Sequence, residues 1–133
     1  MKRIFSMMLA LLMLLVGCGG SPDSGSQKTE AAYQQITQEE AKEMMDTQDV
    51  FILDVREQDE YDSGHIPAAV LLPVGTITKD SAAAVIPEPD SVVLVYCRSG
   101  NRSKTASQAL AELGYANVYE FGGINDWPYE VEK

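Results

Sequence analysis

The residues best suited to chemistry form one short segment between an apolar run and a helical pattern. This segment, residues 97–103, reads CRSGNRS, and the apolar run before it, residues 92–96, reads VVLVY. After the segment, apolar residues between 106 and 113 recur at i, i+3, i+4 and i+7, which predicts a helix. A tight loop leading into a helix directs backbone N–H groups inward and adds the positive end of the helix dipole. We therefore predict that Cys97 has a lowered pKa and acts as the catalytic nucleophile.

The other residues of this segment suit an anionic ligand. Arg98 and Arg102 supply guanidinium donors, each able to bind an anion through two hydrogen bonds. Gly100 permits a backbone conformation that a Cβ would hinder. We expect the hydroxyl and amide side chains of the segment to satisfy loop and helix-start N–H groups first, with substrate contact second. The predicted substrate-binding residues are Arg98, Ser99, Gly100, Asn101 and Arg102.

Strands alternate with helices in the elements that must position this loop. Thr37 and Glu40 form a capping-box pattern, and Gly114 is placed to end the helix after the cysteine segment. Predicted strands cover residues 50–53, 68–72, 92–96 and 118–121, and predicted helices or helical turns cover 38–47, 56–63, 82–86, 106–113 and the region around Trp127. The alternation predicts an α/β domain with a central, mostly parallel sheet and helices on both faces. Ligands bind such sheets beyond the carboxyl ends of the strands, where Cys97 lies.

The N-terminal residues have the pattern of an export signal. A basic start is followed by an apolar run over residues 4–16, which is too short to span a bilayer and right for a signal peptide. The sequence LVGC over residues 15–18 resembles a bacterial lipobox, whereas an ordinary signal peptide or a core helix fits it less well. We predict a signal peptide over 1–17, a lipidated Cys18 with a flexible tether over 18–30, and a folded domain over 31–133. The protein would then be lipid-anchored on the extracytoplasmic face of a bacterial cell membrane.

Composition narrows the remaining classes of function. The chain has 133 residues, enough for one domain, and a formal net charge of -10. That negative charge argues against a nucleic-acid partner, because proteins that bind nucleic acids present a positively charged surface. Two cysteines and one histidine argue against a disulfide scaffold and against a protein-only zinc site. With Cys18 lipidated, Cys97 is the only thiol left.

The chain resembles the single-domain rhodanese family of sulfurtransferases over about residues 33–129. The segment 97–102 is similar to the active-site loop of that family. The motifs DVRE at 54–57, EY at 60–61 and GHIP at 64–67 resemble its upstream signature, and Gly122-Gly123 with Trp127 resembles its C-terminal one. Two positions depart from the pattern, because the family usually has Gly in the place of Ala68 and often a polar residue in the place of Leu71.

This resemblance implies sulfur transfer through a persulfide on Cys97. The donor would be a small sulfur anion such as thiosulfate, and the acceptor cyanide, a thiol or a partner protein. No metal and no organic cofactor is implied. Asp54 is expected to bond to backbone or to Arg56, His65 to have a structural role, and Trp127 to cover the last strand.

Two other classes of function stay open at this point. One is a non-catalytic persulfide carrier or binding module, which the sequence does not separate from an enzyme. The other is a phosphatase or arsenate reductase, since rhodanese-like folds also host those reactions. Four residues separate Cys97 from Arg102, whereas cysteine phosphatases typically have five, and this shorter loop favours sulfur over phosphate.

Overall fold

A computed structural model describes residues 32–133 of the chain. The predicted signal peptide, the lipidated Cys18 and the tether up to residue 30 lie outside the described residues. The strands are β1 (Gln34–Gln35), β2 (Phe51–Asp54), β3 (Ala69–Leu71), β4 (Val92–Cys97) and β5 (Asn117–Gly123). The α-helices are α2 (Gln38–Thr47), α3 (Gln58–Asp62), α4 (Lys79–Val85) and α5 (Asn101–Glu112), with short 3-10 turns η1 (Val74–Thr76) and η2 (Ile124–Asp126).

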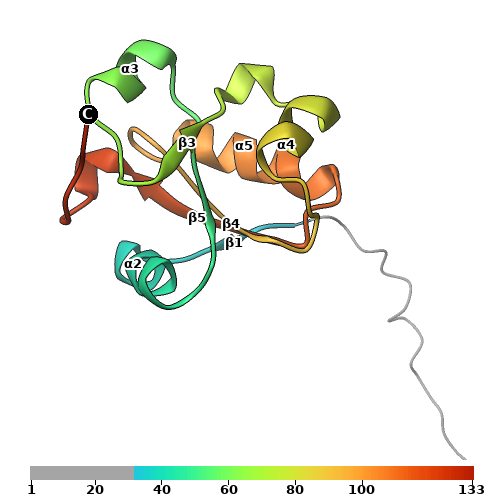
Figure 1. Cartoon of the computed structure of the whole chain (residues 1–133), viewed down its shortest axis with the longest axis horizontal. Coiled ribbons are helices and arrows are strands. Elements are labelled where there is room, and N and C mark those ends of the chain that lie inside the picture. The colour runs from blue at the N-terminus through green and yellow to red at the C-terminus, as the bar shows by residue number, and fades with distance from the viewer. Residues whose placement is uncertain (1–31) are drawn as a thin grey trace, which may run out of the picture. The chain divides into compact units, whose positions relative to one another are not determined.

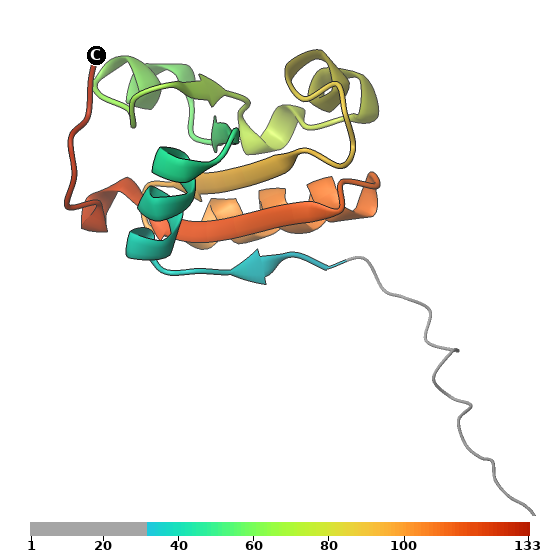
Figure 2. The ribbon, with the colours of Figure 1, turned by 60° about the horizontal axis from the view of Figure 1, so that its bottom comes forward.

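The five strands form one parallel sheet in the order β1-β5-β4-β2-β3 (Figure 1). Figure 2 shows α2 on one side of the strands and α5 on the other. The predicted α/β architecture, with helices on both faces of a mostly parallel sheet, is therefore confirmed. Because all strands run the same way, the loops that follow β2, β4 and β5 meet at one edge of the sheet.

Each face of the sheet has its own apolar core. One core packs α4 and α5 against alternate strand residues such as Leu53, Val93 and Val95. The other packs α2 and the segment after β5 against Leu94, Tyr96 and Phe121. Strand residues of alternate parity supply the two cores, as the period of two in a strand requires. Both faces of the central strands are therefore buried, which explains why their sequences are continuous apolar runs.

Local sequence signals predicted most element positions well. Helix α2 covers the predicted residues 38–47, and Thr37 and Glu40 form the expected capping box. Gly114 has φ +109, as its place after α5 requires. Helix α4 begins three residues before the predicted start, because Thr78 and Ser81 form a second capping box. Strand β1, with two exposed residues, was not predicted.

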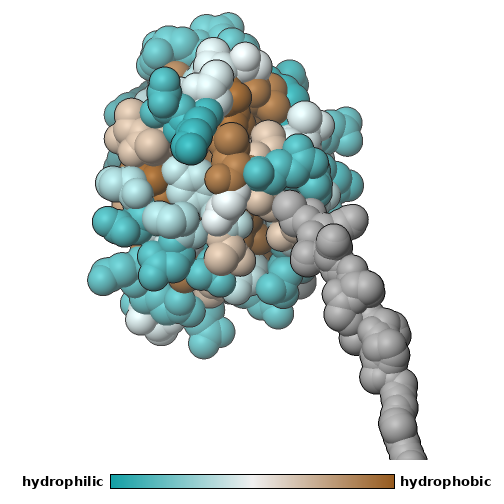
Figure 3. Space-filling model, turned by 90° about the vertical axis from the view of Figure 1, so that its right-hand side faces the viewer, coloured by the Kyte–Doolittle hydropathy of each residue, from teal (hydrophilic) through white to brown (hydrophobic). Residues whose placement is uncertain are grey.

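The surface of the domain is mainly polar. Figure 3, which views the domain from the right-hand side of Figure 1, shows mostly hydrophilic side chains, with one larger group of hydrophobic ones and smaller hydrophobic spots between them. Among residues 32–133, the large hydrophobic side chains that are exposed are those of Val70 and Val131. Within the same residues, no helix is long and apolar enough to cross a membrane.

Candidate active site

Cys97 is the last residue of the central strand β4, and its sulfur faces the start of α5. The backbone N–H of Gly100 donates a hydrogen bond to Cys97 Sγ at 3.0 Å. Gly100 is the N-cap of α5 and has φ +106, a left-handed conformation that favours glycine. The loop therefore wraps the first backbone donors of α5 around the sulfur, as the sequence predicted.

The environment of Cys97 favours its ionised form. The residue is only 1% exposed, and this burial by itself raises the pKa of the thiol. The hydrogen-bond contact with the Ser103 side chain and the hydrogen bonds from the backbone amides of Ser103, Gly100 and Ser99 outweigh the burial, so the pKa of Cys97 is lowered below its ordinary value. The lowered pKa agrees with the sequence-based expectation, and the role of Cys97 as a nucleophile stays a prediction.

Ser103 connects Cys97 to a buried carboxylate. Cys97 Sγ donates to Ser103 Oγ at 3.4 Å, and Ser103 Oγ donates to Glu120 Oε2 at 2.5 Å. Ser103 and Glu120 are 0% and 2% exposed. Sequence reasoning gave Ser103 a capping role and missed Glu120. The available signal was one charged residue inside the apolar run of β5, at a position that shares a face with Cys97.

Arg102 binds a neighbouring carboxylate rather than standing free at the loop. Its Nη1 donates to Glu60 Oε1 at 2.8 Å and its Nη2 to Glu60 Oε2 at 3.0 Å. The Arg102 hydrogen bonds lower the pKa of Glu60 to about 2, and the pairing raises the pKa of Arg102. Arg98, Ser99 and Asn101 are exposed on the loop. The binding of an anion by these residues stays a prediction.

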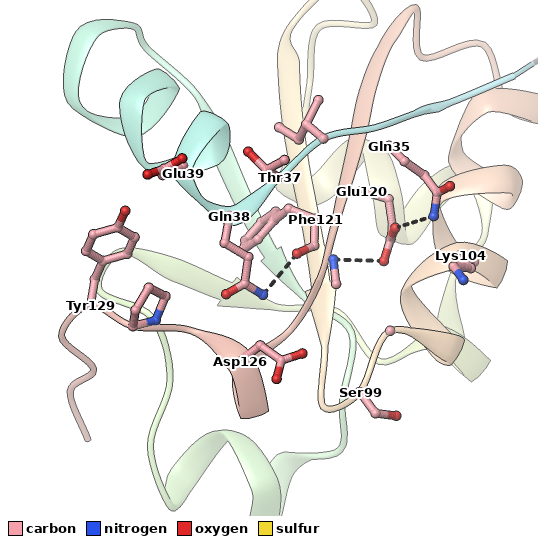
Figure 4. A pocket seen from close by; sticks show the side chains of 14 residues that line it. Gln35, Thr37, Gln38, Glu39, Ser99, Lys104, Glu120, Phe121, Asp126 and Tyr129 are labelled. Carbon is pink, nitrogen blue, oxygen red and sulfur yellow. Dashed lines mark hydrogen bonds between the residues drawn. The ribbon is translucent and has the colours of Figure 1, made fainter.

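The segment after β5 supports the underside of the loop. The N–H of Asn125 donates to the carbonyl of Arg98 at 3.1 Å. Gln38 at the start of α2 donates through Nε2 to the carbonyl of Phe121 at 3.1 Å (Figure 4). The same Nε2 donates to the carbonyl of Gly123 at 2.9 Å. These bonds tie α2, the end of β5 and the cysteine loop into one unit.

A cleft of about 560 Å³ lies beside the loop. Figure 4 shows Ser99, Lys104 and Glu120 on one side of this cleft, with Gln38 and Tyr129 on the other. Cys97 lies beneath the loop and is not among the residues that line the cleft. The cleft offers a space near the loop for a ligand larger than a simple anion.

The DVRE motif at residues 54–57 stabilises the carboxyl end of strand β2 through hydrogen bonds. Asp54 accepts bonds from the Arg56 backbone N–H at 3.0 Å, from Arg56 Nη2 at 2.6 Å and from the Tyr96 hydroxyl at 2.7 Å. Tyr96 in turn accepts from the N–H of Ile66 at 3.0 Å. The expected pairing of Asp54 with Arg56 is confirmed. Both side chains are buried, so their mutual bonds offset the cost of removing two charges from water.

His65 and Trp127 also occupy structural positions. The His65 ring stacks on Tyr61 at 3.8 Å between ring centroids, and His65 Nδ1 lies 3.0 Å from the Tyr61 carbonyl. Trp127 packs on Phe121 of β5 with centroids 5.5 Å apart. These contacts agree with the roles expected for both residues. Within residues 32–133 there is no group of three His, Cys, Asp or Glu side chains that could hold a metal ion.

The chain is thus an α/β domain with a buried cysteine at the carboxyl end of a central parallel strand, where backbone N–H groups surround its sulfur. The chain belongs to the rhodanese-like domain family, whose model matches residues 37–129. It is 38% identical over 96 residues to thiosulfate sulfurtransferase GlpE of Coxiella burnetii, covering 71% of this chain and 87% of that protein.

Two further likenesses agree with this assignment. The putative sulfur carrier protein YrkF of Bacillus subtilis is 32% identical over 109 residues, covering 80% of this chain and 57% of that protein. A solved structure described as rhodanese with anions from E. coli is 30% identical with a TM-score of 0.60, covering 64% of this chain and 99% of that chain. The fold and family expected from the motifs are thus confirmed.

Proposed function

We propose that the protein is a sulfurtransferase that moves sulfane sulfur through a persulfide on Cys97. The observation that carries this proposal is the buried Cys97 sulfur, which accepts the Gly100 N–H at the start of α5. The resemblance to a thiosulfate sulfurtransferase supports the same class of reaction. No residue outside the loop is needed to generate the nucleophile, because the pKa of the thiol is already lowered.

The chemistry takes two steps. The Cys97 thiolate attacks the outer sulfur of a donor such as thiosulfate, a new S–S bond forms, and sulfite leaves with the electron pair of the old one. A thiol or cyanide then attacks the outer sulfur of the persulfide, and the Cys97 thiolate leaves. The loop N–H groups hold the anionic sulfur in both steps, in the manner of an oxyanion hole.

The cations of the loop would bind the donor. Arg98 is exposed beside Cys97. Arg102 uses one hydrogen of each terminal nitrogen for Glu60 and keeps the others for a ligand. Ser99, Gly100 and Asn101 would contribute hydroxyl, backbone and amide groups.

A persulfide carrier is the second candidate function. The similarity to a putative sulfur carrier protein and the near-complete burial of Cys97 both favour it. An enzyme turns over many donor molecules with cyanide, whereas a carrier loads once and releases only to its partner. Multiple-turnover kinetics with thiosulfate and cyanide therefore distinguish the two.

The test uses the protein with Cys18→Ala, which leaves Cys97 as its only cysteine. Exposure to thiosulfate should add the mass of one sulfur atom, and cyanide should remove it. Cys97→Ser should lose both the mass gain and turnover. No persulfide from any sulfane donor would overturn the proposal, and Cys97-dependent hydrolysis of an aryl phosphate would favour the phosphatase instead.

We also propose that Cys18 anchors the protein to the outer face of a bacterial membrane. Support comes from the apolar run and the LVGC sequence that ends at residue 18. Cys18→Ala should leave the precursor unlipidated, because no other cysteine follows the signal closely. A Cys18→Ala protein that is still processed and carries lipid would contradict the proposal.

A further inference from the structure

Glu120 is a buried carboxylate that the proposed reaction does not use. It lies on β5, on the face of the sheet that packs against α5, and is 2% exposed. A charged side chain is rarely found at such a position unless it is paired or fully hydrogen-bonded. No cation is bonded to it among the described residues, so its hydrogen-bond partners must explain it.

All the partners of Glu120 are donors. Gln35 Nε2 donates to Oε1 at 3.1 Å, and the Gly122 N–H donates to Oε2 at 3.0 Å; dashed lines mark both bonds in Figure 4. The Ser103 hydroxyl donates to Oε2 at 2.5 Å. A carboxylate that receives three hydrogens is arranged as an acceptor, which is the ionised form.

Ser103 has only one hydroxyl hydrogen to give. While that hydrogen is on Glu120, the oxygen of Ser103 can only accept from Cys97, as the 3.4 Å contact from the thiol shows. A Cys97 thiolate would instead need the Ser103 hydrogen for itself. Glu120 and the thiolate therefore compete for the same hydrogen, and both are negative charges.

We propose that Glu120 acts through Ser103 as a positioning residue that sets the basicity of Cys97 and so favours the sulfur-loaded state. In the persulfide the negative charge moves to the outer sulfur, one S–S bond away from Ser103 and closer to the loop donors. Glu120 therefore destabilises the free thiolate, which needs the Ser103 hydrogen, more than it destabilises the persulfide, whose charge lies farther from Ser103. This last step rests on the proposed sulfur transfer, but the effect on the thiol does not.

Other charges surround the loop and stay constant in the test. They are Arg98 on the loop, Arg102 and Lys104 on α5, Glu60 on α3 with Glu57 just before it, and Asp126 on η2. None of them is changed in the variants below, so their contributions cancel between proteins.

The test is a pH titration of Cys97 in the Cys18→Ala protein, followed by thiolate ultraviolet absorbance and by the rate of alkylation with iodoacetamide. Glu120→Gln should lower the midpoint by about one unit, a tenfold change in the thiolate-to-thiol ratio. It removes a buried charge and leaves the Ser103 hydrogen to the thiolate. Ser103→Ala should raise the midpoint, because the thiolate loses that donor. Glu43→Gln, the same change at an exposed position of α2, should leave it unaltered.

A double variant separates the relay from simple charge repulsion. If Glu120 acts through Ser103, Glu120→Gln shifts the midpoint less when Ser103 is already alanine. Additive shifts would overturn the relay, as would an unchanged or raised midpoint in Glu120→Gln. Should either buried variant fail to fold by circular dichroism, Gln35→Ala is the substitute at an exposed site. It removes a donor from Glu120 and should raise the midpoint, and an unchanged or lowered value would contradict the proposal.

Sulfur release gives the second measurement. Cyanide should remove the persulfide sulfur about threefold faster in Glu120→Gln, because a less basic thiolate leaves more readily. The expected midpoint shifts without any persulfide would support the relay and overturn the sulfur-transfer function. A persulfide that forms and leaves equally fast in both proteins, with equal midpoints, would overturn the relay alone.

Discussion

Gly123 lies directly beneath the carbonyl of Arg98, so close that a Cβ on Gly123 would overlap this carbonyl and the following amide of Ser99. The φ of Gly123 is -135°, which any residue adopts. Space, and not backbone conformation, therefore requires glycine here. The second glycine after β5 is thus part of the support of the cysteine loop.

Gly123→Ala should displace the loop and disturb Cys97. Overpacking of this kind costs about 1–3 kcal/mol, and the alkylation midpoint of Cys97 should rise as the Gly100 bond lengthens. Gly75→Ala is the matched control, since nothing lies within 4 Å of its added Cβ. Thermal unfolding and alkylation of the two variants are compared. Equal behaviour of both variants would show that the loop tolerates the displacement.

The Glu60–Arg102 pair should make stability depend on acid pH. Arg102 lowers the pKa of Glu60 from its ordinary 4.5 to about 2 in the folded state. The stabilisation is therefore complete above about pH 4.5 and is lost as pH falls through about 2. Its size is about 1 kcal/mol, because both side chains are partly exposed and solvent screens them. In Glu60→Gln the melting temperature should depend less on pH over this range. A pH dependence equal to that of the wild type would contradict the pairing.

Ala68→Gly should stabilise the protein. Ala68 has φ +72, and it is the one non-glycine residue with a positive φ among residues 32–133. The position is exposed, so the methyl group contributes little packing there. Relief of the left-handed strain exceeds the added entropy of glycine in the unfolded chain, and we expect a gain of about 0.5–1 kcal/mol. A lower melting temperature for Ala68→Gly would show that packing of the methyl group outweighs strain.

His65→Phe should weaken the fold and leave the chemistry of Cys97 alone. The ring would still stack on Tyr61 but would lose the contact of Nδ1 with the Tyr61 carbonyl. The expected cost is about 0.5–1.5 kcal/mol. The alkylation midpoint of Cys97 and the rate of persulfide formation should match those of the wild type. If the rate of persulfide formation in His65→Phe no longer shows one of the ionisations seen in the wild-type pH profile, His65 acts as a general base instead.

Much of the secondary structure could be predicted from short stretches of the sequence. The helix over about residues 38–47 was predicted correctly, and its start is fixed because Thr37 and Glu40 bond each other's backbone amides three positions apart. The run over 92–96 is a strand because only a sheet covered on both faces buries such a sequence. The position of the cysteine loop could be predicted in the same way, because the end of a strand, a glycine turn and the start of a helix lie within one short segment.

The contacts that tune the site were decided by the tertiary structure. Ser103 meets Glu120 across 17 residues and Arg102 meets Glu60 across 42, and no local pattern encodes either distance. Strand β1 exists only because β5 offers it a hydrogen-bonding edge, since its own two residues are exposed. The sequence by itself determined that the Cys97 sulfur lies against the backbone N–H groups at the start of α5, because these residues are neighbours along the chain. The partners of Ser103 and Arg102 depend on strand register and helix packing, which the chain acquires only when the whole sheet forms.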